Sequence, residues 1–171
     1  MEFVGPVRFV PGRHVVTGFD CGSESQSIWL RRHAATALGA GTAVTYVITP
    51  AGSDLVAGYH ALAASSVELD AAPTRMLKGA GRSPIPVVLL ARLGVDRQFA
   101  GRGIGAALVK DAMLRAHGAA RGIGARALLI HAESEAARAF YLHLAEFDPS
   151  PTDPLHLVLL MSDIEAALPP K

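Results

Sequence analysis

The alternation of hydrophobic and polar positions predicts helices and strands that follow one another along the chain. Residues 24–38 carry apolar side chains near helical spacing, and Gly39 and Gly41 follow as helix stops. The segment 42–48 is rich in β-branched and aromatic residues and predicts a strand, and residues 55–69 predict one or two more. The N-terminal part of the chain therefore predicts a helix followed by strands.

The C-terminal part of the chain again predicts strands and helices in alternation, and its central apolar run is nearly continuous. A nearly continuous apolar run at 87–95 follows a polar loop over 70–86 and predicts a buried central strand. From Gly103 onward one helical face is apolar, and Gly118 predicts the end of that helix. Ser134 is a predicted N-cap for a short later helix. Two further strands are expected, over 125–132 and 155–161.

This order of elements predicts an α/β fold in which helices flank a mixed central β-sheet. The length of 171 residues fits a core of ordinary size, so we expect a single domain over residues 1–171. No apolar run reaches the roughly 18 to 20 residues that span a bilayer. The start of the chain does not resemble a secretory signal, and Cys21 is the only cysteine, so we expect a cytoplasmic protein without an internal disulfide.

The formal net charge is +1, but the charges are unevenly distributed along the chain. Residues 71–132 contain 10 basic and 2 acidic side chains, which is a net +8. Such a segment can present a basic face to phosphates, although the same charges also fit the solvated faces of ordinary helices and loops. The 7 histidines show no metal-ligand spacing, so no metal is expected.

A glycine-rich loop between the predicted central strand and the long helix indicates an anion site. Gly101, Gly103 and Gly105 permit a close approach of ligand to backbone, and the N–H groups of a helix start favour a phosphate. The loop also fits G-x-G-x-x-A, but it lies too late in the chain for a Rossmann domain, and no Gly-Lys-Ser/Thr follows. A glycine-rich turn that binds nothing is the remaining alternative.

The stretch RLGVDRQFAGRGIGAALVKDA resembles motif A of the GNAT acetyltransferases, whose pattern Q/R-x-x-G-x-G/A matches at Ala100 through Gly105. Ala100 departs from the usual Gln or Arg. A wider set of segments resembles the acetyltransferase toxins of bacterial type II toxin–antitoxin systems: 19–34, 45–49, 56–67, 84–96, 120–132 and 136–147. The resemblance implies the GNAT fold and acetyl transfer from acetyl-CoA to the α-amino group of aminoacyl-tRNA, which halts translation. It also implies a ribbon-helix-helix antitoxin and a toxin homodimer.

The resemblance further implies roles for individual residues. Tyr141 corresponds to the general acid that protonates the departing thiolate. The positions that correspond to the acetyl-CoA site are Leu93, Gly94, Val95, Gly101, Arg102, Gly103, Gly105 and Ala106. A tRNA footprint is expected from six cationic side chains, which are Arg31, Arg32, Arg75, Lys78, Arg82 and Arg92.

Several alternatives stay open at this point. Tyr141 also fits a core pair with Phe140, and no general base is evident, although His131 or Glu133 could relay a proton through water. The chain could instead acetylate a small molecule or a protein, or be a non-catalytic acetyl-CoA-binding module. A purely structural partner would bind no acetyl-CoA at all.

Overall fold

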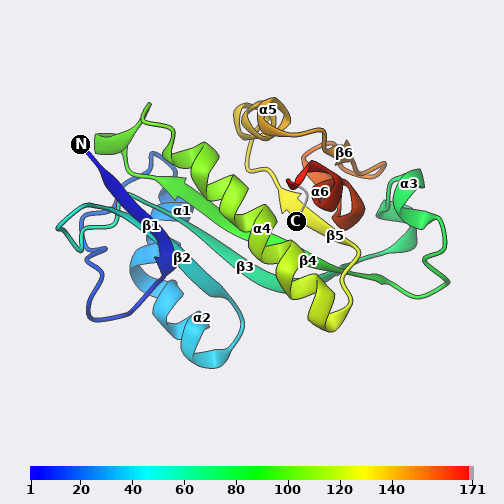
Figure 1. The fold of residues 1–171 in the computed structure, drawn as a ribbon, viewed down its shortest axis with the longest axis horizontal. Helices are drawn as coiled ribbons and strands as arrows, with labels where there is room; N and C mark the ends of the chain where they lie inside the picture. The colour runs from blue at the N-terminus through cyan, green and yellow to red at the C-terminus, as the bar shows by residue number, and fades with distance from the viewer. Residues whose placement is uncertain (170–171) are drawn as a thin grey trace. The chain divides into compact units, whose positions relative to one another are not determined.

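The computed structural model describes residues 1–169, whose strands form a mixed seven-stranded sheet in the order β1-β2-β3-β4-β5-β7-β6 (Figure 1). The strands are β1 (Phe3–Arg8), β2 (Val44–Pro50), β3 (Gly58–Val67), β4 (Ile85–Val95), β5 (Ala127–His131), β6 (Asp148–Pro149) and β7 (His156–Leu160). The helices are α1 (Glu24–Ile28), α2 (Ala34–Ala40), α3 (Thr74–Leu77), α4 (Ile104–Ile123), α5 (Glu135–Leu144) and α6 (Met161–Ala167). This confirms the predicted α/β class and the mixed sheet. No helix among these residues has both the length and the apolar character needed to cross a membrane.

The chain groups into two compact units. The first consists of residues 1–63 and 91–112, and the second consists of residues 64–90 and the described chain from Met113 on. Strands β3 and β4 and helix α4 contribute residues to both units. The single domain expected over 1–171 stays a prediction.

The first unit contains an antiparallel β1–β2–β3 arrangement in which Tyr46 lies opposite His60. One apolar cluster of this unit packs Leu30 and Phe19 against Val47 and Tyr59. Leu30 comes from the predicted first helix, and Val47 and Tyr59 come from strands β2 and β3, so the helix is held by burial of its apolar face.

The predicted first helix is present, but a π turn interrupts it. Helix α1 begins after Ser23, whose side chain accepts a backbone N–H, and α2 ends at Gly41 with a φ of 70°. Between them Trp29–His33 form the π turn η1, which the N–H of Ala34 closes on the carbonyl of Trp29. The turn therefore holds one residue more than an α-helical turn.

The second unit is built on β5, which pairs in parallel with β4 and antiparallel with β7. Leu129 lies opposite Val158, and both belong to an apolar cluster with Met76 of α3. Leu128 lies opposite Leu159 on the other side of the same strand pair. We call these two sides the Leu129 face and the Leu128 face.

The structure differs from the prediction at several boundaries. Helix α4 passes through Gly118 and ends at Ile123, where Gly124 takes a φ of 75°. Residues 55–69 provide the single strand β3, and the predicted loop over 70–86 contains α3 and the 3₁₀ turn η2 (Leu69–Ala71). Strands β1 and β6 and helix α6 were not predicted. Pro6 makes β1 hard to recognise from the sequence, because proline disfavours a strand except at the edge of a sheet. The strand β1 lies at such an edge.

Replacing Gly58 with alanine is expected to destabilise the first unit. The added Cβ would lie 2.7 Å from Cγ2 of Ile104 and 3.1 Å from Cδ1 of Leu108, so the start of α4 would have to move away from β3. We expect the free energy of unfolding in urea to fall by about 1–3 kcal/mol. Gly39→Ala is the control, because its Cβ would meet no atom within 4 Å and alanine favours the helix. Equal stability of the two variants would contradict this account of Gly58.

Candidate functional site

The glycine loop lies between the end of β4 and the start of α4, as predicted. After Val95 the chain forms the 3₁₀ turn η3 (Arg97–Phe99), and Gly101 and Gly103 then take φ values of 75° and 78°. A Cβ at either glycine would meet no heavy atom within 4 Å. The two glycines are therefore required by the backbone conformation, and the space beside them is open.

The loop presents a run of unused backbone donors. Within residues 1–169, none of the six consecutive N–H groups from Gly101 to Ala106 donates to a backbone acceptor. The last of these groups belong to the first turn of the 20-residue helix α4, where the helix dipole favours negative charge. Arg102 is exposed in the same loop and adds a positive charge. This donor set fits a phosphate or pyrophosphate.

Asp96 fixes the path of the chain into this loop, and the sequence analysis missed it. Its side chain is 5% exposed and accepts the N–H of Gln98 at 2.9 Å and the N–H of Asp20 at 3.0 Å. Its own N–H donates to the carbonyl of Ala57 at 2.8 Å. The sequence carried a signal for this role of Asp96. It is an aspartate directly after a predicted buried strand and two residues before the N–H that it accepts.

The segment Leu93–Val95 is the end of β4, and its backbone passes close to its neighbours. A Cβ at Gly94 would lie 3.0 Å from Sγ of Cys21 and 3.1 Å from Cε1 of Tyr59. Glycine is thus required at this position by the close approach of these side chains. Gly94 is buried, and Leu93 and Val95 are half-buried.

A stack of aromatic and cationic side chains lies beside this segment and was not predicted as part of the site. Trp29 in the π turn stacks on Tyr59, with ring centroids 6.0 Å apart and an interplanar angle of 7°. The guanidinium carbon of Arg92 lies 5.8 Å from the centroid of the Trp29 ring, which is cation–π geometry. The stack fixes Arg92, one of the six predicted tRNA contacts, at the end of β4.

Tyr141 lies on α5 with its ring in the core of the second unit. Its side chain packs edge-on against Phe140 and Phe147, with ring centroids 5.3 Å and 6.4 Å away. Burial, reinforced by the negative charge of Glu133, raises the pKa of Tyr141 to about 12. The phenol therefore stays protonated at physiological pH and can act as an O–H donor, while its ring also serves the core packing considered as the alternative.

The six predicted tRNA contacts differ in their surroundings. Arg32, Lys78 and Arg82 are exposed, whereas the guanidinium of Arg31 donates to the carbonyl of Phe19. Three of the six belong to each compact unit.

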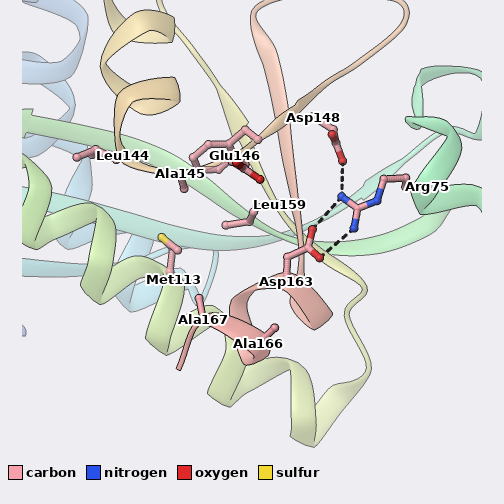
Figure 2. A pocket seen from close by; sticks show the side chains of 11 residues that line it. Arg75, Met113, Leu144, Ala145, Glu146, Asp148, Leu159, Asp163, Ala166 and Ala167 are labelled. Atoms are coloured by element: carbon pink, nitrogen blue, oxygen red, sulfur yellow. Dashed lines mark hydrogen bonds and ion pairs between the residues drawn. The ribbon is translucent and has the colours of Figure 1, made fainter. Parts of the chain in front are cut away.

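Arg75 is held by carboxylates at the rim of a cavity of about 760 Å³ in the second unit (Figure 2). Its Nη2 lies 2.9 Å from Oδ1 of Asp163, and its Nη1 lies 3.3 Å from Oδ2 of Asp148. Leu159 and Met113 contribute to the apolar lining of the cavity. Arg75 is itself exposed, but the paired carboxylates offset its charge and make it less suited to phosphate binding than Arg32, Lys78 and Arg82.

Removing the Asp96 carboxylate is expected to destabilise the loop. In Asp96→Ala the N–H groups of Gln98 and Asp20 each lose a part-buried hydrogen bond to a carboxylate, and a hydrogen bond to a charged group contributes about 1.5–3 kcal/mol. Asp54→Ala is the control, because its exposed ion pair with Arg13 contributes about 0–1 kcal/mol. Chemical denaturation measures both variants, and an Asp96→Ala protein as stable as the control would refute the role given to Asp96.

Comparison with known proteins places this site in a family. The model of the acetyltransferase (GNAT) family matches residues 56–147, which include the glycine loop and Tyr141. A tRNA-acetylating toxin of Mycobacterium tuberculosis is 44% identical over 153 residues, with 90% of each chain covered. A probable toxin TacT of Sinorhizobium fredii is 26% identical over 165 residues, covering 92% of this chain and 91% of the relative.

Solved structures show the same fold. The crystal structure of a tyrosine-to-phenylalanine mutant of KacT matches with a TM-score of 0.84 and 28% identity, covering 91% of this chain and 93% of that one. AtaT complexed with acetyl-methionyl-tRNAfMet matches with a TM-score of 0.82 and 28% identity, covering 96% of both chains. With the family model spanning more than half of its residues, this chain belongs to the GNAT acetyltransferase family.

Proposed function

We propose that this enzyme transfers an acetyl group from acetyl-CoA to the α-amino group of aminoacyl-tRNA and thereby inhibits translation as the toxin of a toxin–antitoxin pair. The observation that carries the cofactor assignment is the run of unused N–H donors from Gly101 to Ala106. The substrate assignment is supported by the 44% identical tRNA-acetylating toxin and by the structural match to AtaT complexed with acetyl-methionyl-tRNAfMet.

The glycine loop is proposed to hold the cofactor through its backbone. Among the described residues, the N–H groups of Gly101, Arg102, Gly103, Gly105 and Ala106 donate to no backbone acceptor, and they suit the pyrophosphate oxygens. Binding through backbone N–H groups does not depend on the side chain at position 100. The Gln or Arg that is usual there is therefore not required, and Ala100 can take its place. The backbone of Leu93–Val95 is proposed to pair with the pantetheine as an added strand would.

Tyr141 is proposed as the general acid of the reaction. Acetyl-CoA supplies an activated acetyl group, and the departing thiolate must receive a proton for the transfer to be completed. A phenol with a pKa near 12 is fully protonated when the thiolate forms, so its proton is available for donation.

The exposed cations are proposed to bind the tRNA backbone. Arg32, Lys78 and Arg82 carry exposed charges, and Arg31 and Arg92 are partly accessible, so they can attract phosphates. Arg75 is included with a weaker contribution, because Asp148 and Asp163 offset its charge.

The partners of the protein are proposed from its relatives. One neighbour is the AtaT mutant toxin bound to the C-terminus of the antitoxin AtaR, and another is a KacTA–DNA complex. By analogy, a ribbon-helix-helix antitoxin would bind this chain, which would act in the cytoplasm as a homodimer.

Labelled acetyl-CoA is expected to transfer its acetyl group to charged tRNA. We expect label on the α-amino group of one or more aminoacyl-tRNAs, with the rate falling steeply as salt screens the tRNA phosphates. Uncharged tRNA, a polyamine and a peptide serve as alternative acceptors in parallel. Label on the polyamine or the peptide alone would refute the tRNA substrate while keeping the acetyltransferase, and binding of acetyl-CoA without any transfer would refute catalysis.

Removing the phenol oxygen of Tyr141 is expected to slow the reaction without weakening cofactor binding. In Tyr141→Phe the ring keeps its contacts with Phe140 and Phe147, but the proton donor is lost, so kcat should fall by about 10²- to 10⁴-fold. Calorimetry should show unchanged acetyl-CoA binding. Tyr46→Phe removes the same atom from β2 and should leave kcat at the wild-type value. A wild-type kcat in Tyr141→Phe would exclude Tyr141 as the acid.

A further inference from the structure

Arg92 is a half-buried cation on β4, just beyond the point where the pairing of β4 with β5 ends. In the described chain this parallel pairing ends at Leu90 and Ile130, while β4 continues to Val95. Beyond Leu90 the edge of β4 that faced β5 is therefore open. With the pyrophosphate at the glycine loop, the pantetheine would run along this edge from Val95 toward Leu93. Its thioester end would then arrive beside Arg92.

The side chain of Arg92 rests on an aromatic stack that is anchored in the first unit. Its guanidinium carbon lies 5.8 Å from the centroid of the Trp29 ring, and Trp29 stacks on Tyr59. Tyr59 is fully buried, and its hydroxyl donates to the carbonyl of Gln26 at 2.7 Å. Arg92 and Gly94 are two residues apart on the strand and so lie on the same face of it. A Cβ at Gly94 would lie 3.1 Å from Cε1 of Tyr59, and all five residues belong to the first unit. The stack therefore has a defined position beside the end of β4.

The described side chains supply no carboxylate to balance the charge of Arg92. Its guanidinium takes part in no ion pair and in no hydrogen bond with any of them, and its one recorded contact is with the tryptophan ring. Other half-buried arginines have acceptors: Arg31 donates to the carbonyl of Phe19, and Arg126 donates to the carbonyl of Met76. An aromatic ring attracts a guanidinium without neutralising it and leaves its N–H donors unused. A half-buried cation in this state favours an anion from outside the protein.

The anion that fits this place belongs to the acceptor substrate. The proposed pyrophosphate site begins at Gly101, beyond the opposite end of the open edge from Arg92. In aminoacyl-tRNA the carboxylate of the amino acid is esterified to the terminal ribose, so phosphates are the anions that every such substrate offers near the reacting amine. The nearest of them joins the terminal nucleotide to the rest of the tRNA. A guanidinium suits this group, because two of its N–H donors match two phosphate oxygens.

We propose that Arg92 binds the phosphate of the terminal nucleotide of aminoacyl-tRNA, and that Trp29 and Tyr59 are positioning residues that hold the guanidinium there. The inference deepens the proposed acetyl transfer and rests on it. The exposed cations attract the tRNA backbone as a whole, whereas Arg92 contacts one phosphate. It selects an amine that is carried by a nucleotide over a free amine, which brings no phosphate. It also aligns the amine with the thioester, since the phosphate and the amine belong to the same end of the substrate.

The first test removes the charge of this one phosphate from the substrate. Charged tRNA is prepared with a neutral methylphosphonate in place of the terminal phosphodiester. A matched control carries the same replacement several nucleotides earlier in the chain. For the wild-type enzyme at saturating acetyl-CoA, we expect kcat/KM to fall by about 10- to 100-fold with the terminal replacement. The earlier replacement should lower kcat/KM far less, because it leaves the contact with Arg92 in place.

The second test makes the same comparison in variants of the stack. Arg92→Gln should bind acetyl-CoA normally, lose about 10- to 100-fold in kcat/KM with unmodified charged tRNA, and no longer discriminate against the terminal methylphosphonate. Trp29→Leu should lose part of this discrimination, whereas Trp29→Phe keeps an aromatic face and should retain most of it. Arg13→Gln is the control and should behave as the wild type, because Arg13 is an exposed arginine of the same unit that pairs with Asp54.

Equal wild-type rates with the terminal phosphodiester and with its neutral replacement would overturn the proposal, and this comparison does not depend on the folding of any variant. Discrimination that persists in Arg92→Gln would overturn it as well. Full discrimination in Trp29→Leu would overturn the positioning role of the stack. A wild-type enzyme that acetylates no charged tRNA would instead refute the proposed function, so the two failures are distinguishable.

Discussion

The close contact between β3 and the first turn of α4 is the constraint on which the anion site depends. Gly58 leaves no room for a side chain, since a Cβ there would meet Ile104 and Leu108. This contact sets how closely the start of the helix approaches the strand, and with it the position of the N–H groups at the N-terminus of the helix. Asp96 acts on the same feature from the other side, because it holds the chain that leads from β4 into the loop. Backbone N–H donors bind a ligand specifically only when the surrounding chain holds them rigidly in position.

The features that could be predicted from the sequence are those with a local cause. The glycine loop was predicted because positive φ values and an open approach demand glycine, and Gly101 and Gly103 have both. Ser134 was predicted as an N-cap, and its side chain accepts the N–H of Ala137. The central strand was predicted from its continuous apolar run, which burial on both sides requires.

The features that could not be predicted have partners far away in the chain. Asp96 caps a turn near its own position, but its second acceptor role serves Asp20, 76 positions earlier. Arg75 counted toward the basic middle of the chain, yet its guanidinium is paired with Asp148 and Asp163. Charge counts along a sequence do not reveal such pairings. The rings of His131 and His156 also stack, which depends in the same way on the register of two strands.

The π turn at Trp29–His33 has a consequence for how this helix can change in evolution. The extra residue lets Trp29 lie flat on Tyr59 while Leu30 and Ala34 both stay in the core. Deleting one residue here would restore a regular α-helix but rotate everything before it by about 100° relative to α2. Trp29 would then leave the tyrosine and the cation–π contact with Arg92. Related chains can thus exchange side chains along this segment more readily than they can change its length.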